Sequence, residues 1–195
     1  MVVVVLGHVP TIKQKVRLCA IIGGMSVAHM AALADRIDRL TSGVGRAVAW
    51  LILVVVGLQF TLVVARYLFG LGSVWLTETV IYAHATLFML AAAWTLLAGG
   101  HVRVDLFYAD ASARTKAMVD LIGALLLLLP FMLVLVWLSV PYAARSWAIL
   151  ERSQEASGLP IVFVLKSLIP VFAVLMALQG ISHAIRAAAV LSRAR

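Results

Sequence analysis

The chain has 195 residues, of which 64% are apolar and 12% are charged, and its mean hydropathy is +1.09. An average soluble domain has about 25% charged residues, so this composition excludes a soluble fold of the same size. The formal net charge of +8 comes from Lys and Arg spread along the chain, whereas a nucleic-acid-binding protein gathers its cations on one face. We therefore expect lipid, and no nucleic acid, among the partners.

Four long apolar windows without Asp, Glu, Lys or Arg predict four transmembrane helices. Each approaches or exceeds the roughly 20 residues that span a hydrocarbon core, and such runs lack the alternating pattern of a barrel strand. We therefore expect an all-α membrane protein in which residues 25–195 form a single four-helix domain. The expected spans are residues 46–67, 76–99, 113–150 including an outer extension, and 160–188.

Residues 1–24 form an N-terminal extension whose order is left open, because none of its apolar stretches is long enough to span a membrane. Met25 and Met30 are alternative starting points for the chain. Cys19 lies in this extension and is the only cysteine, so neither an intrachain disulfide nor a thiolate metal cluster can form.

Residues 27–40 have the pattern of an amphipathic helix, with apolar side chains at helical spacing from Val27 to Leu40. We expect this helix to lie in the cytoplasmic interface and to end at the Thr41–Gly45 stretch, just before the first span. A soluble, partner-facing helix is the alternative. The opposite, polar face is formed by Asp35, Arg36, Asp38 and Arg39.

The turn between the first and second spans carries several helix-end signals. Arg66 marks the outer end of the first span, as snorkelling cations do at a membrane surface. The second helix opens around Trp75, where Ser73 or Thr77 is expected to act as the cap. Glu78 is expected in the first turn of this helix, against its positive end. Gly99 and Gly100 suit the left-handed conformation that terminates a helix.

The third helix is expected to begin near Ser112 and to bend at Pro130 and Pro141, because each proline removes an amide donor. Beyond Pro141 the sequence stays compatible with a helix as far as Glu151. This helix should therefore project past the outer membrane surface. Pro160 suits the first turn of the fourth helix.

The distribution of cations predicts the topology. With four spans both termini lie on one side, and that side carries twelve of the 16 Lys and Arg residues. The positive-inside bias then places both termini in the cytoplasm. The outer side carries Arg66, Arg145, Arg152 and Lys166.

Ionisable groups near the ends of the spans are candidates for ion pairs. Lys166 lies about 9 Å into the fourth helix, and Glu78 is its best partner by depth. The alternatives are that the two side chains are solvated separately, or that they contact a partner subunit. Asp120 is expected to pair with Lys116 four residues earlier, or with Arg103 across the link.

Catalytic chemistry is not indicated. No phosphate-binding loop, zinc-binding His-Glu-x-x-His or Gly-x-Ser-x-Gly motif is present. Glu151 and Glu155 are expected to be two solvated acids on the outer extension. We therefore do not expect an enzyme.

The histidines keep one cofactor alternative open, a b-type haem held by two imidazoles in a redox membrane anchor. His84 is expected to face other helices through a polar bond, and it lies too far in depth from His183 for both to bind one iron. His101 matches His183 in depth but follows two glycines in a loop. A free-standing small membrane assembly or channel protein is the other alternative.

Residues 101–105 (His-Val-Arg-Val-Asp) follow Gly99 and Gly100 in the link between the second and third spans. In an extended segment His101, Arg103 and Asp105 share one side, whereas in a helix His101 and Asp105 pair four residues apart. The glycines favour the extended form. We expect a cytoplasmic clasp that holds the second and third helices and contacts a partner.

The same residues, with others in one order along the chain, resemble the small permease subunit of tripartite ATP-independent periplasmic (TRAP) transporters, the DctQ-like family. The resemblance covers about residues 33–190. It is carried by Trp75-Leu-Thr-Glu78, Ala91-Ala-Ala-Trp94, Gly100-His101, Ser146-Trp147, Glu151, Ser153, Gly158-Leu-Pro160 and Lys166-Ser-Leu-Ile-Pro170.

This resemblance implies a multi-pass protein of the bacterial inner membrane that braces a large permease subunit. A periplasmic solute-binding protein would deliver an organic acid or related solute, and the solute and sodium sites would lie in the large subunit. No cofactor is then expected in this chain. The residues expected to fix the bundle or to contact partners are Arg66, Trp75, Glu78, His101, Arg103, Asp105, Asp120, Glu151, Glu155 and Lys166.

Overall fold

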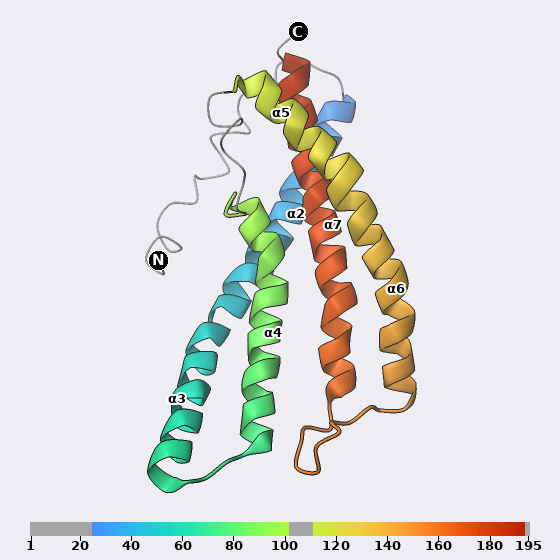
Figure 1. Ribbon diagram of the computed structural model, residues 1–195. Coiled ribbons are helices and arrows are strands. Elements are labelled where there is room, and N and C mark those ends of the chain that lie inside the picture. Colours follow the sequence, from blue (N-terminus) through green and yellow to red (C-terminus); the bar gives the residue numbers. More distant parts are fainter. Residues whose placement is uncertain (1–24, 102–110, 194–195) are drawn as a thin grey trace.

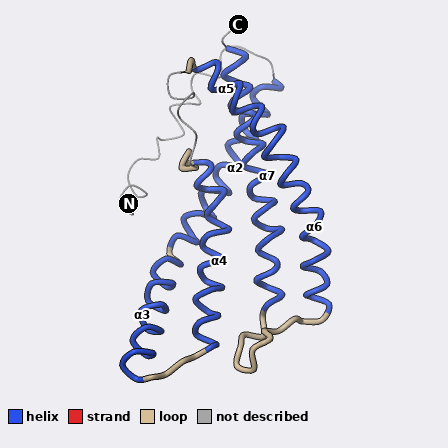
Figure 2. The backbone as a smooth tube through the Cα atoms, viewed as in Figure 1, coloured by secondary structure: helices blue, strands red, loops and turns tan. Residues whose placement is uncertain are grey.

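The computed structural model describes residues 25–101 and 111–193, and within these ranges the chain is helical with no strand (Figures 1 and 2). Four helical runs are long and apolar enough to cross a membrane, as the sequence predicts. The elements are α2 (Met25–Ala49), α3 (Leu51–Phe69), α4 (Val74–Leu97), α5 (Ala113–Ile122), the π-helical turn η2 (Gly123–Leu128), α6 (Leu129–Ala148) and α7 (Val162–Arg193).

Helices α3, α4, α7 and α6 lie side by side in that order, as a single layer (Figure 1). Contacts join α3 to α4, α4 to α7 and α7 to α6, while α2 packs against both α4 and α7. The α3–α4 and α6–α7 connections lie at one end of the layer, and α5 lies at the other (Figure 1). Helix α3, at one edge of the layer, has no buried residue, whereas α6 at the other edge buries four side chains.

The core of the layer lies along α7, where α4 packs on one side and α6 on the other. It consists of Ala93, Met132, Ala173 and Met176, all buried. Alanines at a helix interface let the backbones approach closely, and close packing is a main source of helix association in a membrane. Packing of these side chains fixes the position of α7 between α4 and α6.

The prediction that a break at Thr41–Gly45 separates the interface helix from the first span is wrong. Helix α2 continues through this stretch to Ala49, and with α3 it forms a helical run of 41 residues, 29–69. Gly45 packs directly on Trp94 of α4, and a Cβ at this position would overlap the indole ring. Contact with α4 therefore offsets the low helix propensity of glycine.

Several helix ends follow the predicted signals, but Pro160 lies two residues before α7 begins at Val162, so its expected place in the first turn of that helix is wrong. Ser73 caps α4 by accepting a hydrogen bond from a backbone amide, and Ser112 caps α5 in the same way. Gly70 (φ 62°) and Gly99 (φ 70°) adopt the left-handed conformation after α3 and α4. Glu78 is the fifth residue of α4, so its expected place in the first turn is wrong. Its carboxylate is directed to another part of the chain.

One turn of the third helix, just before Pro130, is wider than an α-helical turn. Pro130 has no amide proton to donate back to the preceding turn. The chain adopts the π-helical turn η2 just before this proline, and the amide of Leu129 donates to the carbonyl of Ala124, five residues earlier. At its outer end the helix stops at Ala148, three residues short of the expected Glu151, because Leu150 takes a positive φ of 46°.

Candidate functional site

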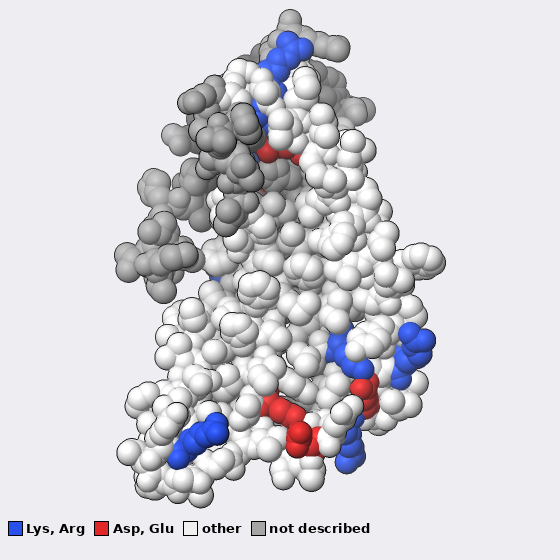
Figure 3. Space-filling view, viewed as in Figure 1, with Lys and Arg blue, Asp and Glu red and all other residues white. Residues whose placement is uncertain are grey.

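Charged side chains gather near the two ends of the helix layer, with a broad band of other residues between them on the face in view (Figure 3). This distribution fits four apolar spans in a membrane. Two clusters of polar contacts, one at each end, hold segments that are far apart in the sequence.

The first cluster, which we name the loop anchor, consists of Glu78, Ser153, Gly158 and Leu159. The carboxylate of Glu78 on α4 accepts hydrogen bonds from the Ser153 hydroxyl and from the Leu159 amide, the latter at 2.5 Å. A Cβ on Gly158 would lie 2.8 Å from Glu78 Oε1 and would overlap Ser153. Glu78 thus fixes the α6–α7 loop against α4, and only glycine fits at position 158.

Lys166 on α7 binds Glu151 rather than Glu78, so the predicted Lys166–Glu78 pair is wrong. Its Nζ lies 2.5 Å from Glu151 Oε2 and 4.4 Å from the centre of the Tyr142 ring. The Ser146 hydroxyl donates to the same Glu151 oxygen at 2.7 Å. These contacts show that Glu151 is not the solvated acid that we expected.

The charge state of Glu151 follows from these contacts. The loop that carries Glu151 lies outside the membrane-spanning helices. Hydrogen bonds from Lys166 and from Ser146 lower the pKa of Glu151 below its ordinary value. The carboxylate is therefore ionised across the neutral range and remains paired with the ammonium group.

Trp147 adds a third link between α6 and α7 at this end. Its indole Nε1 donates to Ser167 Oγ at 2.7 Å, and its ring meets Phe163 edge to face with 4.5 Å between centroids. An indole that is apolar on its face and bonded at its nitrogen is typical of a membrane interface.

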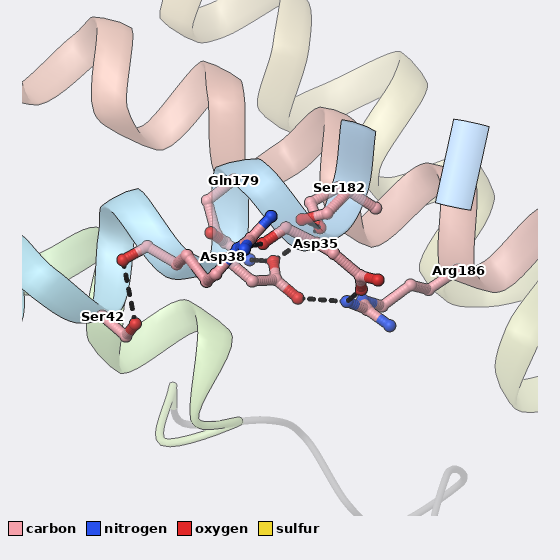
Figure 4. Close-up of polar contacts among 8 residues, drawn as sticks. Asp35, Asp38, Ser42, Gln179, Ser182 and Arg186 are labelled. Atoms are coloured by element: carbon pink, nitrogen blue, oxygen red, sulfur yellow. Dashed lines mark hydrogen bonds and ion pairs between the residues drawn. The ribbon is translucent and has the colours of Figure 1, made fainter. Parts of the chain in front are cut away.

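The second cluster lies at the opposite end, and we name it the inner network: Asp35 and Asp38 on α2, with Gln179, Ser182 and Arg186 on α7 (Figure 4). The side chain of Arg186 forms ion pairs with both carboxylates, at 2.9 Å for Asp35. Asp38 is only 3% exposed and accepts hydrogen bonds from Ser182 (2.6 Å) and from Gln179 (3.0 Å) as well.

The inner network contradicts the expected polar face of residues 27–40. Asp38 does not point to solvent, because Ala34, Asp38 and Thr41 lie on one buried stripe that faces α7 and α4. A buried carboxylate requires a cation and hydrogen-bond donors, and α7 supplies both from a single face. The sequence did contain a signal, since Gln179, Ser182 and Arg186 recur at helical spacing around the end of an apolar run.

A family model described as "Tripartite ATP-independent periplasmic transporters, DctQ component" matches residues 52–190. The chain belongs to the DctQ family. No curated protein and no solved structure matches it. The matched region contains the loop anchor, Glu151 and Lys166, and the α7 half of the inner network. Helix α2, with Asp35 and Asp38, precedes the matched region.

Membership of the DctQ family makes the chain a small membrane subunit of a TRAP transporter. Among the other residues expected at the outer end of this subunit, Glu155 contacts the loop anchor through its backbone amide, which donates to Ser153 Oγ at 3.2 Å. Arg66 is exposed in the last turn of α3, Trp75 is half exposed in the first turn of α4, and Glu155 is exposed in the α6–α7 loop. Their expected contacts with partners stay predictions.

At the inner end, His101 is exposed directly after the turn that closes α4, and Asp120 is partly exposed on α5. Arg103 and Asp105, and with them the expected clasp, lie outside the described residues, as do residues 1–24. His84 is exposed on α4 and stacks on Phe88, with 6.4 Å between ring centroids, so the expectation that it faces other helices of this chain is wrong.

Proposed function

We propose that this DctQ-family chain braces the large permease subunit of a TRAP transporter during sodium-coupled uptake of an organic acid or related solute. The solute is delivered by a periplasmic binding protein, and the solute and sodium sites lie in the large subunit. The protein resides in the bacterial inner membrane with both termini in the cytoplasm.

The observation that carries this proposal is a helix layer fixed at both ends and uncovered at its edges. Glu78 and the Glu151–Lys166 pair bind the outer loop, while Asp38 and Arg186 bind α2 to α7. In contrast, α3 has no buried residue, and its large side chains such as Phe60 are exposed. A rigid subunit with open apolar edges is suited to supporting a larger membrane protein.

The orientation is supported by the charges of the chain. Arg36, Arg39 and Arg46 are exposed on α2, on the side that carries most of the cations. Under the positive-inside rule this side is cytoplasmic. The loop anchor then lies at the periplasmic surface, where a solute-binding protein docks.

The test is co-purification. The chain is tagged and expressed together with a large TRAP permease encoded beside it, and the membranes are extracted in mild detergent. We expect the two proteins to elute as one complex, and we expect the chain to be required for uptake of the solute by cells. A control bait is an unrelated four-helix membrane protein expressed at the same level.

Two other results would overturn the proposal. A chain that purifies alone, and whose deletion leaves uptake intact, is a free-standing membrane protein. A chain that purifies with a Soret absorption band is a haem-binding redox anchor.

A further inference from the structure

Two polar side chains in the middle of adjacent spans have no hydrogen-bonding partner. Gln59 on α3 and His84 on α4 are both exposed, and within residues 25–101 and 111–193 neither side chain makes a hydrogen bond. In contrast, the hydroxyl groups of Thr61 and Thr86 donate to carbonyls of their own helices, at 2.9 and 2.8 Å. Gln59 and His84 therefore keep unused hydrogen-bonding groups inside the membrane.

The two side chains lie at the same depth. Gln59 is ten residues before α3 ends at Phe69, and His84 is ten residues after α4 begins at Val74. At 1.5 Å per residue both lie about 15 Å below the α3–α4 turn, which is half of a hydrocarbon core about 30 Å thick. Acyl chains at this depth offer neither a donor nor an acceptor. Lipid alone would therefore leave both polar groups unpaired, at a cost in free energy.

The two side chains also point to the same face of the α3–α4 pair. Val55 belongs to the less exposed side of α3, which packs against α4. Ala92 of α4 packs toward the core on α7, so the opposite side of α4, with Val80, faces α3. Gln59 and His84 each follow these valines by four residues, which is a rotation of about 40° past the contact. Because α3 and α4 are antiparallel, the same rotation turns both side chains to one face (Figure 1).

The charge on this face disfavours a second copy of the chain as the partner. Arg66 is exposed seven residues after Gln59, which places it two helical turns closer to the outer surface on the same side of α3. A symmetric dimer with its two-fold axis along the membrane normal brings equal depths together, so it would place two Arg66 side chains opposite each other. Like charges across an interface are unfavourable. A partner of different sequence avoids this repulsion.

We propose that Gln59 and His84 together bind one carboxamide or carboxyl side chain on a transmembrane helix of the large permease. The Gln59 amide offers donors and an acceptor, and a neutral imidazole offers one of each. A carboxamide, or a carboxyl group that carries its proton, has both a donor and an acceptor and can pair with both residues at once. The inference rests on the proposed function, which supplies the identity of the partner.

The test measures the dissociation constant of the complex between the labelled full chain and the large permease in mild detergent. Gln59→Leu and His84→Leu should each raise the dissociation constant about threefold to tenfold, because each removes an interhelical hydrogen bond. His84→Gln keeps a donor and an acceptor and should bind like the wild type. The leucine variants alone should melt at or above the wild-type temperature, which separates lost binding from lost folding.

Thr61→Val is the matched control. Thr61 is exposed on the same helix, but its hydroxyl donates to the carbonyl of Gly57 in that helix, so its removal should leave the dissociation constant unchanged. Wild-type dissociation constants for both leucine variants would overturn the proposal. An equal rise for Thr61→Val would also overturn it, since loss of any polar group on α3 would then have the same effect.

A photoreactive phenylalanine analogue in place of Phe88 identifies the occupant of this face. Phe88 is 71% exposed and lies one turn from His84. Cross-links to the large permease support the proposal, whereas cross-links to a second copy of the chain, or to lipid alone, would overturn it. A wild-type chain that forms no complex with the permease would contradict the proposed function. A complex that tolerates both leucine substitutions would contradict only this binding site.

Discussion

Replacing Asp38 with alanine removes the acceptor on which three side chains of α7 converge. In the native chain its carboxylate accepts hydrogen bonds from Gln179 and Ser182 and pairs with Arg186, while only 3% of Asp38 is exposed. The substitution therefore leaves polar groups buried between α2 and α7 without their partner. We expect it to loosen α2 from the layer.

The magnitude follows from the burial of each group. The Gln179 amide and the Ser182 hydroxyl are almost fully buried, and a buried donor that loses its acceptor costs about 1–3 kcal/mol. Ser182 keeps a weaker contact with the carbonyl of Ala34 at 3.4 Å, which lowers its share. The Arg186 side chain is 40% exposed and keeps Asp35, so its loss adds less than about 1 kcal/mol. The expected total is about 2–4 kcal/mol.

The assay is thermal or denaturant unfolding of the purified chain in detergent, with Asp35→Ala as the matched control. The side chain of Asp35 is 23% exposed, and within the described residues its carboxylate pairs with Arg186 alone, so its loss should cost less than about 1 kcal/mol. If the two substitutions destabilise the chain equally, or if Asp38→Ala costs less than about 0.5 kcal/mol, the buried network does not hold α2.

Three further predictions concern the loop anchor, the α2–α4 contact and the outer ion pair. Gly45→Ala should destabilise the chain, because a Cβ at position 45 overlaps Trp94. Gly43→Ala should not, because a Cβ at position 43 meets nothing within 4 Å. Equal melting temperatures of the two variants would refute the contact between Gly45 and Trp94. Glu78→Ala should expose the α6–α7 loop to protease, because the loop loses two hydrogen bonds to the carboxylate, each worth about 1.5–3 kcal/mol. An unchanged rate of cleavage would show that Glu78 does not hold the loop. Because the pKa of Glu151 is lowered, its pair with Lys166 stabilises the fold at neutral pH, and this contribution is lost only as the pH falls through the lowered pKa. Glu151→Gln should therefore flatten the acid limb of the stability profile below the ordinary glutamate pKa of about 4.3, and an unaltered profile would contradict the pair.

The sequence predicted the transmembrane architecture well because long apolar runs leave few alternatives in lipid. The four spans, the cap at Ser73, the start of the third helix near Ser112 and the left-handed Gly99 are local features, and each was predicted from a few neighbouring residues. Local signals failed at Thr41–Gly45, where glycines predicted a break. There the packing of Gly45 on Trp94, a contact between distant residues, decided the outcome.

The polar contacts were predicted less well, for a related reason. Lys166 and Glu78 were matched by depth alone, but the positive φ at Leu150 ends α6 early and turns Glu151 toward α7. The oxygens of Glu78 are then used by the α6–α7 loop. Asp38 was assigned to a polar face because helical periodicity describes one helix and does not show what packs on it.

The most direct test of the proposed function is solute uptake by cells that carry the large permease and the binding protein, with and without this chain. We expect sodium-dependent uptake of an organic acid only when the chain is present, with a partial loss for Asp38→Ala, which weakens the brace, and none for Asp35→Ala. Equal uptake with and without the chain, at equal levels of the large permease in the membrane, would contradict the account.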